Sequence, residues 1–222
     1  MTPPFSFRVP ESAIRIPPSA ILLLGPTGSG KTPLGECIER EGLWGRRCFH
    51  FDFGANLRQI AVGAVPAADL TPNDRRIVDR VLKTGALLEE REFPIARRVL
   101  QTFLDARGVE AGDMILLNGL PRHAGQADKI EDLLRVGLVV FLSCTARAVY
   151  DRVRLNSGGD REGRLDDSPA DIERKLRIFE ERTLPLLDHY RRRGVAVQEV
   201  PVDVDTGAET IRQRLNCLAC PF

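Results

Sequence analysis

The most regular feature of the sequence is an alternation between short unbroken hydrophobic runs and longer stretches in which hydrophobic residues recur every three or four positions. The unbroken runs are typical of buried β-strands, and the periodic stretches are typical of amphipathic helices. The runs predict strands at residues 20–24, 47–51, 114–117, 138–142 and 195–200. The periodic stretches predict helices at residues 30–41, 54–62, 89–107, 126–135, 146–155, 168–193 and 208–215, with a further helix after Thr71.

Unbroken strands separated by helices favour an α/β fold in which a parallel sheet has helices on both faces. Right-handed crossovers place the carboxyl ends of the strands along one edge of the sheet, where ligands bind. Two local signals refine the helices. Thr71 and Pro72 are typical of an N-cap followed by the first helical position. Pro94 predicts that the regular helix within residues 89–107 begins or bends there.

The composition is that of an ordinary globular domain. With 222 residues, 43% of them hydrophobic, the chain can bury the core of one α/β domain. A net charge of +1 gives no reason to expect a nucleic acid or a membrane as partner, and no hydrophobic run approaches the ~20 residues that cross a bilayer. Residues 1–18 are rich in proline and do not read as a signal peptide. We therefore expect an N-terminal extension at 1–18, one domain at 19–222 and a cytoplasmic location.

The five cysteines are too scattered to form a disulfide framework in a chain of this length. Cys217 and Cys220 form a C-x-x-C pair, but one pair supplies only half of a tetrahedral zinc site. The pair is also predicted to lie in a terminal helix rather than after a strand. We expect incidental thiols, with a metal or redox role as the alternative.

A glycine-rich segment after the first predicted strand carries the clearest chemical signal. Its sequence, G-P-T-G-S-G-K-T, matches the phosphate-binding pattern G-x-x-x-x-G-K-[ST] at every fixed position. The glycines let successive N–H groups converge on phosphate oxygens at the positive end of the next helix. Lys31 brings a charge to the β- and γ-phosphates, and the Thr32 hydroxyl can bind Mg²⁺. The expected ATP-binding residues are Gly25, Gly28, Ser29, Gly30, Lys31 and Thr32.

Many hydrolases, switches and kinases share this loop, so other segments must narrow the reaction. These segments are F-D-F-G-A-N-L-R at 51–58, L-N-G-L-P-R at 117–122 with Q-A at 126–127, and G-R-L-D-D at 163–167 with T-L-P-L at 183–186. Together with the P-loop, they resemble the adenylate kinase family of nucleoside monophosphate kinases in its short-lid form. The resemblance covers residues 20–215. It implies a three-layer P-loop NTPase fold with a small helical monophosphate-binding insertion at 53–84 and a short lid at 156–166.

The resemblance also implies roles for single residues. Arg58 and Arg122 would grip the α-phosphate of the acceptor, and Gln126 would hydrogen-bond its base. Arg152 and Arg164 would close over the donor phosphates, since guanidinium groups bind phosphate oxygens in pairs. The implied catalytic residues are Lys31, Arg122, Arg152 and Arg164, and the implied monophosphate-binding residues are Gly54, Arg58, Leu88, Gly119, Arg122, Gln126 and Lys175.

The implied reaction is direct phosphoryl transfer from ATP to a nucleoside monophosphate, most simply AMP, with Mg²⁺ as cofactor and the enzyme as a monomer. Asn118 stands where the family has an aspartate that helps to hold Mg²⁺, and Asn156 and Lys175 stand where it has arginines. Phe53 replaces a threonine, either as a stacking surface for a base or as a packed wall, and Arg154 could substitute for the arginine missing at Asn156. These departures leave two alternatives: a weak or inactive nucleotide-binding regulatory protein, and a kinase for another small acceptor.

Overall fold

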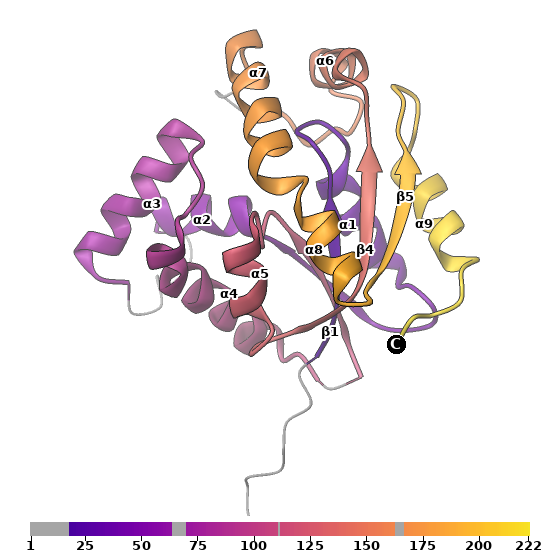
Figure 1. Ribbon diagram of the computed structural model, residues 1–222, viewed down its shortest axis with the longest axis horizontal. Coiled ribbons are helices and arrows are strands. Elements are labelled where there is room, and N and C mark those ends of the chain that lie inside the picture. The colour runs from indigo at the N-terminus through magenta and orange to yellow at the C-terminus, as the bar shows by residue number, and fades with distance from the viewer. Residues whose placement is uncertain (1–17, 64–69, 111, 163–166) are drawn as a thin grey trace, which may run out of the picture.

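The sheet that the hydrophobic runs predict is present. The computed structural model describes residues 18–63, 70–110, 112–162 and 167–222, and in these residues five parallel strands form one sheet in the order β2–β3–β1–β4–β5 (Figure 1). The strands are β1 (Ser19–Leu24), β2 (Cys48–Asp52), β3 (Met114–Asn118), β4 (Arg135–Ser143) and β5 (Ala196–Pro201). Because all pairs are parallel, the carboxyl ends of the strands lie along one edge, as predicted.

Helices cover both faces of the sheet, because alternate residues of a strand point to opposite sides. On β1, Ile21 and Leu23 belong to the hydrophobic cluster of one face, and Ala20 and Leu22 belong to that of the other. The first face is covered by α1 (Lys31–Glu41) and α9 (Ala208–Asn216), and the second by α4 (Phe93–Arg107), α5 (Ala124–Ile130) and α8 (Leu186–Arg192). This is the predicted three-layer α/β fold.

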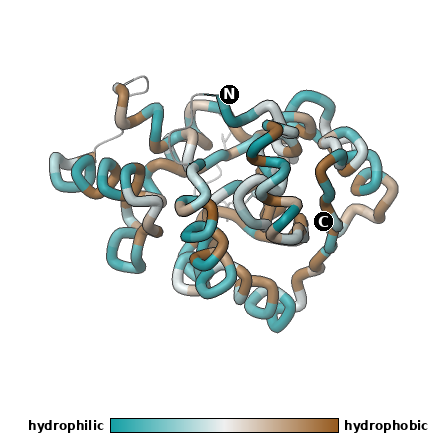
Figure 2. The backbone as a smooth tube through the Cα atoms, turned by 90° about the horizontal axis from the view of Figure 1, so that it is seen from above, coloured by the Kyte–Doolittle hydropathy of each residue, from teal (hydrophilic) through white to brown (hydrophobic). Residues whose placement is uncertain are grey.

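The other helical elements flank the carboxyl edge of the sheet. They are α2 (Phe53–Ala61), α3 (Pro72–Thr84), the short 3-10 helix η1 (Glu90–Glu92), α6 (Ala146–Leu155), α7 (Pro169–Ile178) and the π-helical turn η2 (Phe179–Thr183). Figure 1 shows α2 and α3 to one side of the sheet and α6 and α7 above the ends of its strands. Seen from above, the outer helices alternate between hydrophilic and hydrophobic residues, as helices with one buried face do (Figure 2).

Both local helix signals are confirmed. The Thr71 hydroxyl accepts a hydrogen bond from the Asp74 N–H over 3.2 Å, and the Asp74 carboxylate accepts one from the Thr71 N–H over 3.0 Å, which is a capping box. Helix α4 begins at Phe93, so Pro94 lies in its first turn. Proline is tolerated there because the first N–H groups of a helix have no partner within the helix.

The helix expected over residues 168–193 is interrupted. It consists of α7, η2 and α8, with Leu184 and Pro185 between the last two. The Leu184 N–H donates to the Phe179 carbonyl, five residues back, over 2.7 Å. Pro185 has no N–H to donate to the carbonyl four residues back, and its ring would clash with that carbonyl in a regular α-helix. The turn before it therefore adopts the wider π-helical form.

Three further boundaries were predicted wrongly. The helix predicted at 126–135 ends at Ile130, because the chain turns into β4, where the Arg135 N–H donates to the Pro18 carbonyl over 3.0 Å. Strand β4 therefore begins three residues earlier than expected. The C-x-x-C pair follows α9 instead of lying in it. In the part of the chain that the structure describes, no helix is both long and apolar enough to span a bilayer.

Candidate active site

A cleft of about 1060 Å³ opens at the carboxyl edge of the sheet, between the P-loop (residues 25–32), α2, α4 and the loop after α6. Most of the residues that the sequence nominated line it, although they come from distant parts of the chain. They are Gly25, Gly28, Gly30, Lys31, Thr32, Gly54, Arg58, Leu88, Gly119, Arg122, Gln126 and Lys175. The sheet edge therefore gathers the predicted donor and acceptor groups around one cavity.

The P-loop has the backbone shape that phosphate binding requires. Gly28 and Gly30 have φ angles of 75° and 92°, in the left-handed region that favours glycine, and Gly30 is the residue before α1. Ser29 is fully buried and is not among the residues that line the cleft. The Lys31 ammonium donates to the carbonyls of Gly25 and Pro26, each over 2.7 Å, so its charge lies inside the loop.

Positive charge is concentrated around this loop. The pKa of Lys31 is lowered from 10.5 to about 7, first because the ammonium is buried and then because Arg122 and Arg161 are close. Burial also lowers the pKa of Arg122, to about 10. A bound polyanion would oppose both shifts, because it adds negative charge beyond that of Asp52 and Asp160, which already act on Lys31.

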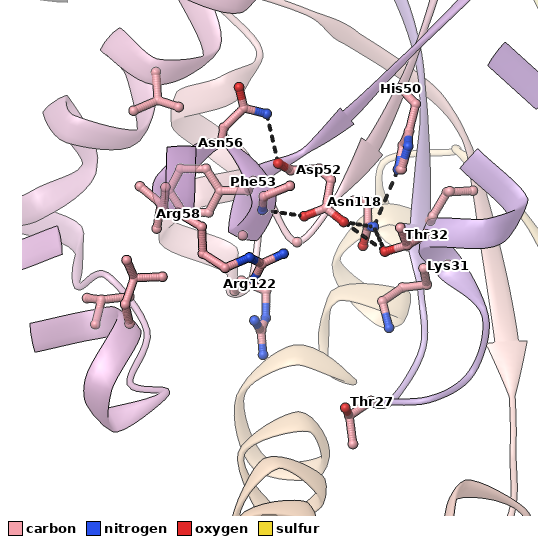
Figure 3. A pocket seen from close by; sticks show the side chains of 18 of the residues that line it. Thr27, Lys31, Thr32, His50, Asp52, Phe53, Asn56, Arg58, Asn118 and Arg122 are labelled. Carbon is pink, nitrogen blue, oxygen red and sulfur yellow. Dashed lines mark hydrogen bonds between the residues drawn. The ribbon is translucent and has the colours of Figure 1, made fainter. Parts of the chain in front are cut away.

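A pair of arginines lines the part of the cleft that faces the P-loop. Figure 3 shows Arg58, from α2, and Arg122, after β3, projecting into the same part of the cleft, opposite Lys31. Gly54 lies beside Arg58: a Cβ atom at position 54 would be 3.4 Å from the guanidinium, at van der Waals contact. Phe53 is buried, with its ring centroid 6.1 Å from that of Phe51, and forms part of the wall.

Gln126 is held at both ends of its amide. Its Oε1 accepts from the Arg122 N–H over 2.7 Å, and its Nε2 donates to the Leu88 carbonyl over 2.8 Å. A primary amide has two acceptor lone pairs and two donor hydrogens, so one of each remains after these two bonds, and Gln126 is among the residues that line the cleft. Gln126 thus fixes Arg122 and Leu88 to each other beside the acceptor space.

A carboxylate that the sequence analysis did not select lies beside the P-loop. The Thr32 hydroxyl donates to Asp52 Oδ2 over 2.7 Å, and Asn118 Nδ2 donates to the same oxygen over 2.9 Å (Figure 3). Asn118 Nδ2 also lies 3.0 Å from Thr32 Oγ1 and 3.4 Å from the ring nitrogen Nε2 of His50. We call this group the Thr32–Asp52–Asn118 corner. The only sequence signal was an acid at the end of a predicted strand.

The loop between α6 and α7 reaches the P-loop through an arginine that was also missed. Arg161 Nη2 donates to Thr27 Oγ1 over 3.0 Å, and its Nη1 donates to Asp167 over 2.5 Å. Lys175 pairs with the same Asp167 oxygen at 3.4 Å. Asn156, where the family has an arginine, accepts from the Arg161 N–H over 3.1 Å and so shapes the loop that carries the guanidinium. We refer to residues 156–162 as the lid loop.

Arg152 and Arg154 do not reach the cleft. Arg152 is buried and donates to the carbonyls of Gly28 at 2.9 Å and of Asp203, Val204 and Thr206. It therefore ties the P-loop to the loop after β5. Arg154 is 78% exposed and faces Asp151, so it is not a substitute for the arginine missing at Asn156. The predicted catalytic Arg164 lies outside the described residues.

Two further observations concern metal binding and the cysteines. Among the residues described, no group of three or more histidine, cysteine or acidic side chains is arranged to hold a metal ion. A site for Mg²⁺ does not need one, because this ion is typically held by one or two carboxylates together with the phosphates of the substrate. Cys217 and Cys220 are exposed free thiols at the far end of the chain.

Known proteins resemble the chain over most of its length. It is 30% identical over 181 residues to the adenylate kinase of Stenotrophomonas maltophilia (strain R551-3), an alignment that covers 78% of this chain and 86% of that protein. It is 27% identical over 203 residues to the adenylate kinase of Synechococcus sp. (strain WH7803), which covers 88% and 96%. The UMP-CMP kinase of Lentinula edodes is 31% identical over 100 residues, 45% of this chain and 42% of that protein. No family model matches the chain.

Proposed function

The chain belongs to the adenylate kinase family of nucleoside monophosphate kinases, and we propose that it transfers the γ-phosphoryl group of ATP to AMP. Membership of this family makes the chain a phosphotransferase. Its relatives include both adenylate kinases and a UMP-CMP kinase, so membership does not assign the base of the acceptor. AMP is proposed because two relatives that align over most of the chain are adenylate kinases.

One observation carries the proposal: two groups of cationic side chains face each other across the cleft. The P-loop with Lys31 forms the first, and Arg58 with Arg122 forms the second (Figure 3). A hydrolase needs only the first, with a water molecule opposite. A pair of arginines opposite the P-loop is suited to a second phosphate, which guanidinium groups bind in a planar, bidentate manner.

In the proposed mechanism, the protein positions the two nucleotides and stabilises the charge of the transferring group. The P-loop N–H groups and Lys31 bind the donor phosphates, and Arg122 spans the space toward the acceptor phosphate that Arg58 holds. Arg161 closes the donor side from the lid loop and excludes water. No side-chain nucleophile is needed, because the transition state is loose and its charge lies on the equatorial oxygens.

The P-loop end of the cleft fits a divalent cation. Thr32 and Asp52 bring a hydroxyl and a carboxylate oxygen to one point, where the Asn118 N–H group donates to both, and oxygen ligands are what Mg²⁺ prefers. Thr32 would hold the ion together with the donor phosphates. Mg²⁺, when bound, neutralises charge on the β- and γ-phosphates. We further propose a monomer that acts in the cytoplasm on free nucleotides.

The test is ADP release from Mg²⁺-ATP with AMP, CMP, UMP, GMP and their deoxy forms supplied one at a time. Release with AMP well above that with the other acceptors supports the proposal. Release with a different monophosphate would keep the kinase and reject AMP. ATP binding without release for any acceptor would instead favour a nucleotide-binding regulatory protein.

A further inference from the structure

We propose that Asp52 supplies the carboxylate that holds the divalent cation of the donor nucleotide. The cation needs one carboxylate in the pair 52/118, and this carboxylate can stand at position 52 on β2 or at position 118 on β3. The proposal rests on the proposed function only for the identity of the donor, ATP. It concerns a residue that neither the P-loop pattern nor the motif around Asn118 selects.

Strand register carries the first step. Strands β2 and β3 are neighbours in the sheet, and Asp52 is paired with Asn118 at their carboxyl ends. The two side chains meet, with Asn118 Nδ2 donating to Asp52 Oδ2 over 2.9 Å. A carboxylate on either residue would therefore reach the same space beside Thr32.

Charge carries the second step. An aspartate at position 118 would bring a second carboxylate within hydrogen-bonding distance of Asp52, and two like charges that close cannot both ionise without a large cost. The corner can therefore hold one ionised carboxylate at low cost. In this chain that carboxylate is Asp52, at the end of β2. The amide of Asn118 is then the complementary partner, because its N–H groups donate where a carboxylate can only accept.

The third step is that Asp52 is already fixed in place. Its Oδ1 accepts from the Ala55 N–H over 2.8 Å, as the N-cap of α2, and its Oδ2 accepts from Thr32 and Asn118. The Thr32 oxygen accepts one hydrogen bond, from Asn118, and keeps one lone pair. A cation in this corner would find a carboxylate and a hydroxyl oxygen that the sheet and the helix cap already hold in place, which lowers the cost of binding.

The experiment measures how much Mg²⁺ strengthens nucleotide binding, without any acceptor. A non-hydrolysable ATP analogue is titrated calorimetrically into the full chain with Mg²⁺ and again with EDTA, and the ratio of the two affinities is the metal enhancement. Asp52→Asn keeps the shape of the side chain and an acceptor for the helix cap. We expect it to lower the enhancement about ten- to hundredfold, without weakening binding in EDTA.

Two further variants decide the interpretation. Glu36→Gln removes another carboxylate from the lining of the cleft and should leave the enhancement unchanged. The exchange variant Asp52→Asn/Asn118→Asp moves the carboxylate to β3 and should restore most of it. An unchanged enhancement in Asp52→Asn, an equal loss in Glu36→Gln, or no recovery in the exchange variant would each overturn the proposal. Because no phosphoryl transfer is measured, the outcome is independent of whether AMP is the acceptor.

Discussion

Arg161 of the lid loop donates a hydrogen bond to the Thr27 hydroxyl of the P-loop over 3.0 Å, across 134 positions of sequence. The contact places a guanidinium at the mouth of the donor site, next to Lys31, whose pKa it helps to lower. Asn156 lies in the same loop with its side chain turned to the Arg161 backbone. We propose that Arg161 supplies, five residues later, the charge that the resemblance to the family implies at position 156.

The first prediction concerns this arginine. We expect Arg161→Ala to lower kcat for phosphoryl transfer about a hundredfold, because a charge that stabilises the transferring group is lost. Arg154→Ala, on the neighbouring helix, removes an exposed arginine and should leave kcat unchanged. Steady-state kinetics of both variants provide the comparison, and equal rates for Arg161→Ala and Arg154→Ala would refute the assignment.

The second prediction concerns Arg122, which lies between the two phosphate positions. Arg122→Ala should reduce kcat/KM for transfer by about 10²- to 10³-fold, while the urea midpoint of unfolding stays near that of the parent chain. Arg122→Lys should recover little of the rate, because an ammonium cannot bind two phosphate oxygens in a fixed plane. Rates like those of the parent chain in Arg122→Ala would contradict its catalytic role.

The third prediction separates Arg152 from these residues. Its guanidinium is buried and donates to carbonyls on both sides, so we expect its loss to destabilise the fold. Arg152→Leu should lower the free energy of unfolding by about 2–4 kcal/mol, since several buried carbonyls lose their donor. Urea denaturation measures this, and Arg154→Leu, whose side chain is exposed, should change it by no more than about 0.5 kcal/mol. A stable Arg152→Leu variant with lost transfer would show a catalytic role instead.

The fourth prediction concerns the close approach of α1 to β2. A Cβ atom at Gly35 would lie 2.3 Å from the His50 ring, which is buried. Gly35→Ala should therefore destabilise the protein by about 1–3 kcal/mol, although alanine is normally the better helix former. In a His50→Ala background the same substitution should become neutral or stabilising. A double-mutant cycle by urea denaturation tests this, and additive effects would contradict it.

The fifth prediction is a pH dependence of stability. The pKa of Glu209 is lowered from 4.5 to about 2, first by the hydrogen bond from Arg212 and then by that from Cys37. A lowered folded-state pKa stabilises the protein above pH 4.5, and this contribution is lost as the pH falls from 4.5 toward 2. At pH 6, Glu209→Gln should therefore have a lower urea midpoint of unfolding than the parent chain. The two midpoints should converge near pH 2. A constant difference across that range would disprove it.

The sequence predicted well what local rules decide. The P-loop follows from eight consecutive residues, the Thr71 cap from Thr71 and Pro72, and the order of strands and helices from their periods. The widened turn before Pro185 was missed, since the periodicity of residues 168–193 continues through it.

The relationships across the sheet could not be predicted in the same way. Asp52 and Asn118 are 66 positions apart, and their contact depends on β2 lying next to β3, which no local pattern reveals. Arg152 and Arg161 show the same limit on the lid side. An arginine-rich stretch does not tell which guanidinium packs inward and which reaches the P-loop, because tertiary packing decides that.

The central claim, direct transfer to a monophosphate, is tested most directly by following the γ-phosphorus of ATP. With ATP labelled at that position, Mg²⁺ and AMP, the account predicts that the label appears in the β-position of newly formed ADP, in equal amount to the ADP left by the donor. Arg122→Ala should suppress this transfer. Label recovered only as inorganic phosphate, or retained in ATP with every monophosphate supplied, would contradict the account.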